Sequence, residues 1–249
     1  MDTICPMARV RLDQLVVTRG LAPSRERARA LVLAGQVRVD GKPVTKAGTT
    51  VDEASDVALI APDHPYVGRG GLKLAHALDT FHIDVTGREC LDIGASTGGF
   101  TDAMLQRGAA RVVALDVGHG QLDWRLRNDA RVVVLEHMNA RHLTPAALPG
   151  PVDLVTIDVS FISLARILPV VPPILAPGGD VVALVKPQFE AGRAEVRKGI
   201  IRDSAIHDRV LEEVTTAGAE VGLTRVAWTP SPVTGQKGNV EFLIYFRVA

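Results

Sequence analysis

The sequence predicts an α/β protein in which a small α+β domain precedes a doubly wound domain with a seven-stranded sheet. From Cys90 onward, short apolar runs alternate with amphipathic segments, which is the pattern of strands and helices that follow one another. The run Val181–Val185 is wholly apolar, as expected of a parallel strand covered on both faces. Before Cys90 the pattern differs, because two short helices and a hairpin signal come first.

The N-terminal part predicts a compact helix–helix–hairpin unit. Leu12, Leu15 and Val16 have the spacing of a helix face. Ser24 is a good N-cap for a second helix, and Asp40-Gly41 is typical of a hairpin turn. We expect helices over 11–19 and 25–34, and strands over 37–39 and 57–60, with 42–44 leading out of the hairpin turn.

The remainder predicts one helix and then alternating strands and helices. Strands are expected at Cys90–Ile93, Arg111–Asp116, Val132–Leu135, Val152–Asp158, Asp180–Lys186, Leu223–Trp228 and Val240–Val248. Helices are expected near Leu72–Phe81, Phe100–Arg107, Ile162–Leu175 and Ser204–Ala217. The predicted boundaries are a first domain at 7–61, a linker at 62–69 and a catalytic domain at 70–249.

Composition excludes several classes of protein. The two cysteines, Cys5 and Cys90, cannot form a disulfide framework, and neither belongs to a metal-binding cluster, so we expect no metal. A secretory signal and a run of about 18 apolar residues are both missing, which predicts a cytoplasmic protein without a membrane span. We expect a monomer, and Met7 has the features of a natural start.

Charge is unevenly distributed along the chain. The net charge is zero, but from Arg9 to Gly48 nine Lys/Arg face three Asp/Glu, a local charge of 9 − 3 = +6. A basic N-terminal segment followed by an acidic remainder is typical of a polyanion-binding module joined to a catalytic domain. The candidate phosphate-binding residues are Arg9, Arg11, Arg25, Arg27, Arg29, Lys42 and Lys46.

A glycine-rich turn is the strongest chemical signal. Asp92 lies near the end of a predicted strand and is followed by Gly94, Gly98 and Gly99, which allow close approach of the backbone to a ligand at a helix N-terminus. Asp116 ends the next strand, where an acid can accept hydrogen bonds from ribose hydroxyls. The pattern predicts a nucleoside-cofactor site.

Two further charged residues end predicted strands. Asp158 ends the fourth strand and Lys186 the fifth. Because ligands of open α/β sheets bind at the carboxyl ends of the strands, both are candidate site residues. Ser160 and Ser163 lack a nucleophile elbow, which argues against a hydrolase.

These motifs follow the order of a known family. The chain resembles the TlyA or haemolysin-A-like family of ribosomal RNA 2′-O-methyltransferases, whose catalytic domain is similar to the FtsJ (RrmJ) enzymes. The resemblance rests on Arg69-Gly-Gly-Leu-Lys73-Leu, Leu91-Asp-Ile-Gly-Ala-Ser-Thr-Gly-Gly-Phe100, Asp158-Val-Ser-Phe-Ile-Ser163, Val185-Lys-Pro-Gln-Phe-Glu190 and Gly238-Asn-Val-Glu241. The N-terminal unit resembles the RNA-binding domain of ribosomal protein S4.

The resemblance implies a Rossmann-like, seven-stranded methyltransferase domain that uses S-adenosylmethionine (SAM), with an S4-like domain before it. It implies a catalytic tetrad of Lys73, Asp158, Lys186 and Glu241. It also implies a cofactor site formed by Asp92, Gly94, Ser96, Gly98, Phe100, Asp116 and Asn139. The implied partner is ribosomal RNA or a ribosomal subunit, with cytidine as the modified nucleotide.

The chemistry suits these residue types. A ribose hydroxyl holds its proton tightly, so a positioned base must remove it. Lysine can act as that base only when neutral, which burial and a neighbouring cation favour, whereas nearby acids oppose it. We expect Lys186 as base or hydroxyl-positioning residue and Lys73 as electrostatic support. Two alternatives stay open: a membrane-active haemolysin-like protein, and a non-catalytic rRNA-binding or assembly factor.

Overall fold

A computed structural model describes residues 9–33, 35–60, 64–192, 195–196 and 199–248. The chain divides into two compact units, Met1–Pro65 and Tyr66–Ala249. Cys5 and the candidate start at Met7 lie outside the described residues.

The first unit contains two helices and two small sheets around one apolar core. Helices α1 (Leu12–Thr18) and α2 (Arg25–Leu33) lie where the periodicity predicts them, and the Arg27 amide donates to Ser24 Oγ as an N-cap. The three-stranded sheet has the order β3-β2-β5, and the two-stranded sheet pairs β1 with β4. The strands are β1 (Arg9–Arg11), β2 (Val37–Val39), β3 (Lys42–Val44), β4 (Thr50–Asp52) and β5 (Val57–Leu59). Pairing of β1 with β4 is not apparent from the sequence, because each strand has only three residues.

The second unit is built on the predicted seven-stranded sheet. Its order is β11-β12-β10-β9-β6-β7-β8. The strands are β6 (Glu89–Ile93), β7 (Arg111–Leu115), β8 (Val132–Leu135), β9 (Val152–Ile157), β10 (Leu175–Val185), β11 (Leu223–Pro230) and β12 (Phe242–Val248). Strands β6 to β10 pair in parallel, but β12 is antiparallel to both β10 and β11. The last strand therefore departs from the parallel arrangement that its apolar residues favour.

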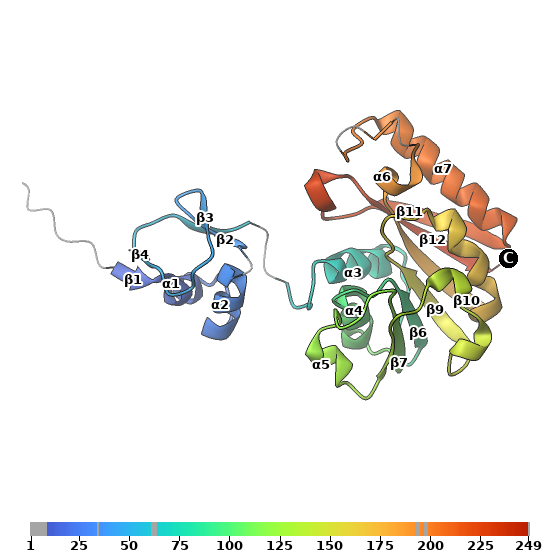
Figure 1. The fold of residues 1–249 in the computed structure, drawn as a ribbon, viewed down its shortest axis with the longest axis horizontal. Helices are drawn as coiled ribbons and strands as arrows, with labels where there is room; N and C mark the ends of the chain where they lie inside the picture. The colour runs from blue at the N-terminus through green and yellow to red at the C-terminus, as the bar shows by residue number, and fades with distance from the viewer. Residues whose placement is uncertain (1–8, 34, 61–63, 193–194, 197–198, 249) are drawn as a thin grey trace, which may run out of the picture. The chain divides into compact units, whose positions relative to one another are not determined.

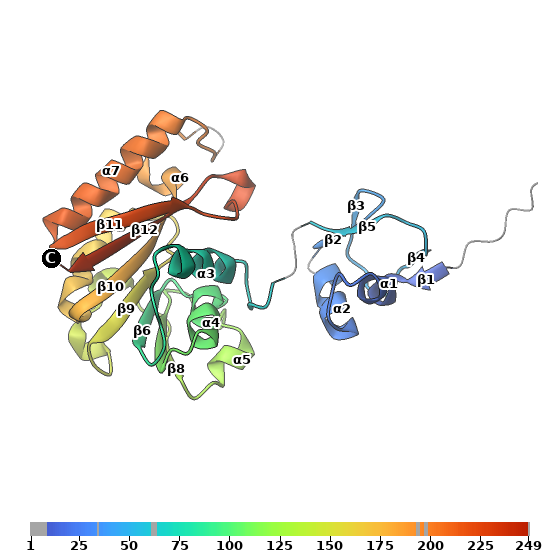
Figure 2. The ribbon, with the colours of Figure 1, turned by 180° about the vertical axis from the view of Figure 1, so that it is seen from behind.

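Helices cover both faces of this sheet, so the unit has three layers (Figures 1 and 2). On one face Leu91 belongs to a core cluster that includes Val210 of α7 (Ser204–Glu220). On the other face Cys90 packs with Leu74 of α3 (Gly70–Thr80) and Met104 of α4 (Gly99–Gln106). The strand alternates between two apolar layers, which explains why its residues are continuously hydrophobic. The described part of this unit also contains two short helices, α5 (Trp124–Arg127) and α6 (Pro187–Glu190).

One predicted helix is wrong. The segment Ile162–Leu175 forms three short 3₁₀ turns at Leu164–Arg166, Leu168–Val170 and Pro172–Ile174. Pro169, Pro172 and Pro173 each remove a backbone donor and clash with the preceding turn, so a continuous α-helix cannot form. The apolar side chains are nevertheless buried against the sheet.

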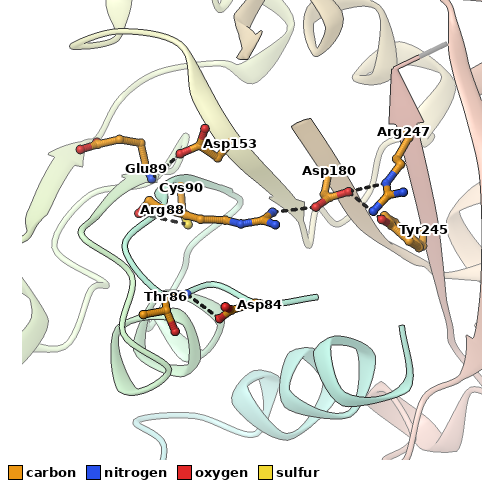
Figure 3. A network of polar contacts seen from close by, with 9 residues as sticks. All are labelled: Asp84, Thr86, Arg88, Glu89, Cys90, Asp153, Asp180, Tyr245 and Arg247. Carbon is orange, nitrogen blue, oxygen red and sulfur yellow. Dashed lines mark hydrogen bonds and ion pairs between the residues drawn. The ribbon is translucent and has the colours of Figure 1, made fainter. Parts of the chain in front are cut away.

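A polar network surrounds the buried Asp180, at the end of the sheet where β10 begins its pairing with β12 (Figure 3). The carboxylate of Asp180 accepts hydrogen bonds from Arg88 at 2.6 Å, Tyr245 at 2.6 Å and Arg247 at 2.9 Å. Burial favours the neutral form of Asp180, but these three donors outweigh it, so the pKa of the carboxyl lies below its ordinary value. Lys186 is six residues further along the chain, roughly 20 Å away at the rise of a strand. The network is therefore structural and distant from that end of the sheet.

Candidate active site

Charged side chains from separate strands meet at one edge of the sheet. Asp158 directly follows β9 and Lys186 directly follows β10, and these strands are parallel neighbours. Because β12 runs antiparallel, the residue before it, Glu241, lies at the same edge. The register pairs Val185 with Phe242, which places Lys186 and Glu241 side by side at the end of the ladder.

Helix α3 supplies the fourth charged residue. Lys73 Nζ lies 2.5 Å from Glu241 Oε2, although the two are 168 residues apart. Both side chains are buried: Lys73 is 9% exposed and Glu241 3%. A Cβ on Gly71 would lie 2.2 Å from the Tyr66 ring, and one on Gly99 would lie 2.9 Å from the Gly71 amide nitrogen, so α3 packs closely on α4.

Lys186 forms the second ion pair. Its Nζ lies 2.5 Å from Asp158 Oδ1, in a contact without hydrogen-bonding geometry, and donates a hydrogen bond to Ser160 Oγ at 3.0 Å. Lys186 is only 8% exposed. The edge thus holds two buried amines, each compensated by one carboxylate. Buried charges in proteins are normally paired in this way, since isolated ones are very costly.

The glycine-rich turn between β6 and α4 has a backbone that only glycine adopts without strain. Gly94 has φ +87° and Gly98 φ +95°. A Cβ on Gly94 would lie 2.5 Å from the carbonyl oxygen of Asp158, and one on Gly98 would lie 2.3 Å from Leu126 Cδ1. The turn therefore packs directly beneath the charged edge.

Asp92 lies beneath this turn and is fully buried. Its Oδ2 accepts hydrogen bonds from the Thr101 amide at 2.9 Å and from Thr101 Oγ1 at 2.7 Å, and its Oδ1 accepts one from Thr156 at 3.2 Å. Burial raises the pKa of Asp92 to about 7, although the threonine bonds oppose the shift. In this structure Asp92 holds the start of α4 and does not line the three cavities described below.

Asp116 is the second acid of the expected cofactor site. It follows β7 and its carboxylate accepts hydrogen bonds from the Ser96 amide at 2.8 Å and the Gly118 amide at 2.7 Å. Asp116 is partly exposed and lines a cavity of about 440 Å³. It therefore connects the two loops that form one wall of that cavity.

Three adjoining cavities open along this edge, and Asp158 and Ser160 line all of them. The 440 Å³ cavity contains Gly94, Ser96, Asp116 and Asn139. A second, of about 180 Å³, contains Gly94, Ser96, Phe100 and Lys186. The third, of about 200 Å³, contains Lys73, Asp158, Lys186 and Glu241 together. Of the expected cofactor residues, only Asp92 and Gly98 line none of the three.

Phe161 and Gln188 line the third cavity and were not singled out from the sequence. Phe161 is 87% exposed at φ +65°, and its ring centroid lies 4.9 Å from that of Phe189. An exposed phenylalanine with positive φ is unusual, and the motif Asp158-Val-Ser-Phe was the only sequence signal for it.

The seven candidate phosphate-binding residues of the first unit fall into two groups. Arg11 and Arg25 both bond to the buried carboxylate of Asp13, at 2.9 Å and 3.2 Å, while half of each guanidinium side chain stays exposed. The hydrogen bond from Arg11 is the main cause that lowers the pKa of Asp13 to about 2. Arg27 is partly buried and donates to the His64 carbonyl at 3.4 Å. The exposed remainder comprises Arg9, Arg29, Lys42 and Lys46.

Two searches of the described part of the chain are negative. No group of three or more His, Cys, Asp and Glu side chains there is arranged to hold a metal ion. No helix there is long and apolar enough to cross a membrane.

Comparison with known proteins agrees with this architecture. Residues 66–248 match the FtsJ-like methyltransferase family and residues 10–57 match the S4 domain. The chain is 48% identical over 241 residues to the 16S/23S rRNA (cytidine-2'-O)-methyltransferase TlyA of Mycobacterium tuberculosis, covering 96% of this chain and 90% of the relative. It is 42% identical over 241 residues to Hemolysin A of Brachyspira hyodysenteriae, covering 96% and 100%.

Solved structures lead to the same conclusion. A Streptococcus thermophilus protein that carries a hemolysin name shares 46% identity and superposes with a TM-score of 0.77, over 98% of this chain and 90% of that one. An S-adenosylmethionine-dependent methyltransferase from Mesorhizobium loti shares only the fold, with 18% identity, a TM-score of 0.51 and coverage of 69% and 96%. The chain belongs to the TlyA family of FtsJ-like methyltransferases that carry an S4 domain.

Proposed function

We propose that this protein transfers a methyl group from SAM to the 2′-hydroxyl of a cytidine ribose in ribosomal RNA. The observation that carries the proposal is the 200 Å³ cavity lined by Lys73, Asp158, Lys186 and Glu241 together. The relatives named for this reaction extend over nearly the whole chain, which supports the choice of cytidine and of ribosomal RNA. We assign RNA binding to residues 7–61, a linker to 62–69 and catalysis to 70–249.

The residues around the 440 Å³ and 180 Å³ cavities fit SAM. Asp116 offers a carboxylate to the ribose hydroxyls, and Asn139 offers an amide near the adenine. Gly94, Ser96 and Phe100 line the smaller cavity and suit the methionine part. Their backbone would hold SAM closely, because Gly94 has no Cβ to displace the Asp158 carbonyl. When bound, SAM supplies an electrophilic methyl group on its sulfonium.

The chain's own residues prepare the ribose hydroxyl. Lys186 lines both smaller cavities, where its amine in the neutral form would hold the hydroxyl and accept its proton. Ser160 and Asp158 fix the direction of that amine. The Lys73–Glu241 pair lines the same cavity and keeps a cation near Lys186 without leaving a charge unpaired. Asp92 completes the proposed cofactor site, and its bonds to Thr101 hold the start of α4.

The first unit supplies affinity for the RNA phosphates. The best candidates for phosphate contacts are the exposed cations Arg9, Arg29, Lys42 and Lys46. Further candidates are Arg11, Arg25 and Arg27, whose guanidinium groups also bond within the unit. A substrate in the ribosome places the activity in the cytoplasm.

The experiment is methyl transfer from tritiated SAM to purified small and large ribosomal subunits. We expect label in RNA, recovered as 2′-O-methylcytidine after digestion to nucleosides. Label on a base, or none on either subunit, would contradict the proposal. Because two relatives carry hemolysin names, leakage of phospholipid vesicles by the purified protein should be measured in parallel, and leakage without methyl transfer would favour a membrane-active protein.

A further inference from the structure

The 200 Å³ cavity contains more than the four charged residues that the proposed function uses. Arg69, Gln188 and Thr234 add polar groups to its wall, and Phe161 and Phe189 add apolar ring surface. Its volume suits a small planar group next to the ribose hydroxyl at Lys186. The cavity therefore has the composition of a nucleobase site, with apolar faces and a few oriented polar groups.

Gln188 has an unusual environment in this wall. It lies in the short helix α6, two residues after Lys186, so the backbone that positions the amine also positions the amide. Its carbonyl oxygen Oε1 is buried and has no hydrogen-bond donor among the described residues. A buried acceptor without a partner costs about 1–3 kcal/mol, so such groups are rare unless a ligand completes them.

The chemistry of that oxygen restricts its partner. A carbonyl oxygen accepts hydrogen bonds and cannot donate one. Among the nucleobases, cytosine and adenine present an exocyclic amino group that donates, whereas uracil and guanine present a carbonyl at the corresponding position. With the amide held in the orientation of this structure, a uracil in this cavity would place two carbonyl oxygens against each other. A site built around an unpaired polar group discriminates strongly in this way.

We propose that Gln188 is a specificity-determining residue that accepts a hydrogen bond from the exocyclic amino group of the target base. This inference rests on the proposed function, since it assumes that the ribose of that base meets Lys186. In this proposal the Gln188 amide selects the base, and the amines of Lys73 and Lys186 in the same cavity serve methyl transfer.

The test uses ribosomal subunits as substrates. The modified nucleotide is first mapped with wild-type protein, and subunits are then purified from bacterial strains that carry C, A, U or G at that position. We measure kcat/KM for methyl transfer by wild-type protein, by Gln188→Met and by Gln106→Met. Methionine matches the length of glutamine without its polar atoms, and Gln106 is an exposed glutamine of α4 that serves as the matched control.

Wild-type protein should prefer C over U at least tenfold. Gln188→Met should lower kcat/KM on C about ten- to a hundredfold and reduce the C-to-U ratio to within about threefold of one. Gln106→Met should keep the wild-type ratio. Two measurements check that the Gln188→Met variant is folded. One is its affinity for SAM, and the other is the midpoint of urea unfolding monitored by tryptophan fluorescence.

Each outcome decides one point. Equal use of C and U by wild-type protein would overturn the inference without any variant, and so would a Gln188→Met protein that is folded and keeps the full preference for C. Equal use of C and A supports the shared amino-group chemistry. Absence of transfer by wild-type protein to every subunit would instead refute the proposed function itself.

Discussion

The buried pair Lys73–Glu241 allows a quantitative prediction. Lys73→Met leaves a carboxylate that is 3% exposed without its partner, and Glu241→Met leaves an ammonium in a residue that is 9% exposed. Breaking a buried ion pair from one side costs about 3–5 kcal/mol, whereas replacing both partners with apolar residues is often nearly neutral. Each single variant should therefore destabilise the second unit by about 3–5 kcal/mol, and the double variant by much less than the sum.

Tryptophan fluorescence during urea denaturation is the appropriate assay. The chain has two tryptophans, Trp124 and Trp228, and both lie in Tyr66–Ala249, so the signal reports on this unit alone. For a unit of this size each kcal/mol shifts the melting temperature by about 2–4 °C, so the single variants should melt about 6–20 °C lower. Additive effects of the two substitutions would refute the reasoning, because they would mean that the charges do not interact across a buried contact. A folded double variant should still fail to transfer methyl groups.

Three further predictions concern other parts of the molecule. Gly94→Ala introduces a Cβ 2.5 Å from the Asp158 carbonyl at φ +87°, and should cost about 1–2 kcal/mol of stability and at least a tenfold loss of SAM affinity by calorimetry. Burial raises the pKa of Asp92 from 3.8 to about 7, so the folded unit keeps a proton that the unfolded chain releases. The free energy of unfolding contributed by Asp92 should fall as pH rises from 3.8 to about 7, and Asp92→Asn should remove this slope in urea titrations at several pH values. If six basic residues of the first unit contact phosphates, RNA affinity should follow salt with a log–log slope of about −4 to −5, and Arg29→Ala should reduce its magnitude by about one.

Much of the sheet could be predicted because buried parallel strands are continuous apolar runs with a charged residue where each one ends. Asp158 and Lys186 were recognisable by this rule alone. The antiparallel direction of β12 was not, since an apolar run has no direction, and this direction is what places Glu241 beside Lys186. The prediction that Lys73 lies beside the other three charged residues depended on the family resemblance. Helix α3 is not part of the sheet, and only tertiary packing fixes its position.

The predicted helix over Ile162–Leu175 was wrong because local pattern and tertiary context differ there. The prolines at 169, 172 and 173 outweigh the apolar periodicity of their segment. The carboxylate of Asp92 bonds to the Thr101 amide, a contact that spacing alone does not indicate, and its role in the cofactor site stays a prediction. The contacts of Arg11 and Arg25 with Asp13 show that basic residues in a cluster also have structural partners.

The central claim is that the buried amine of Lys186 accepts the proton of the ribose hydroxyl. Lys186→Arg keeps the positive charge but removes a group that can become neutral. We predict that single-turnover methyl transfer to ribosomal subunits falls at least a hundredfold in this variant, while the dissociation constant for SAM stays within about threefold of wild type. Methyl transfer at a rate close to wild type by the Lys186→Arg protein would contradict the claim.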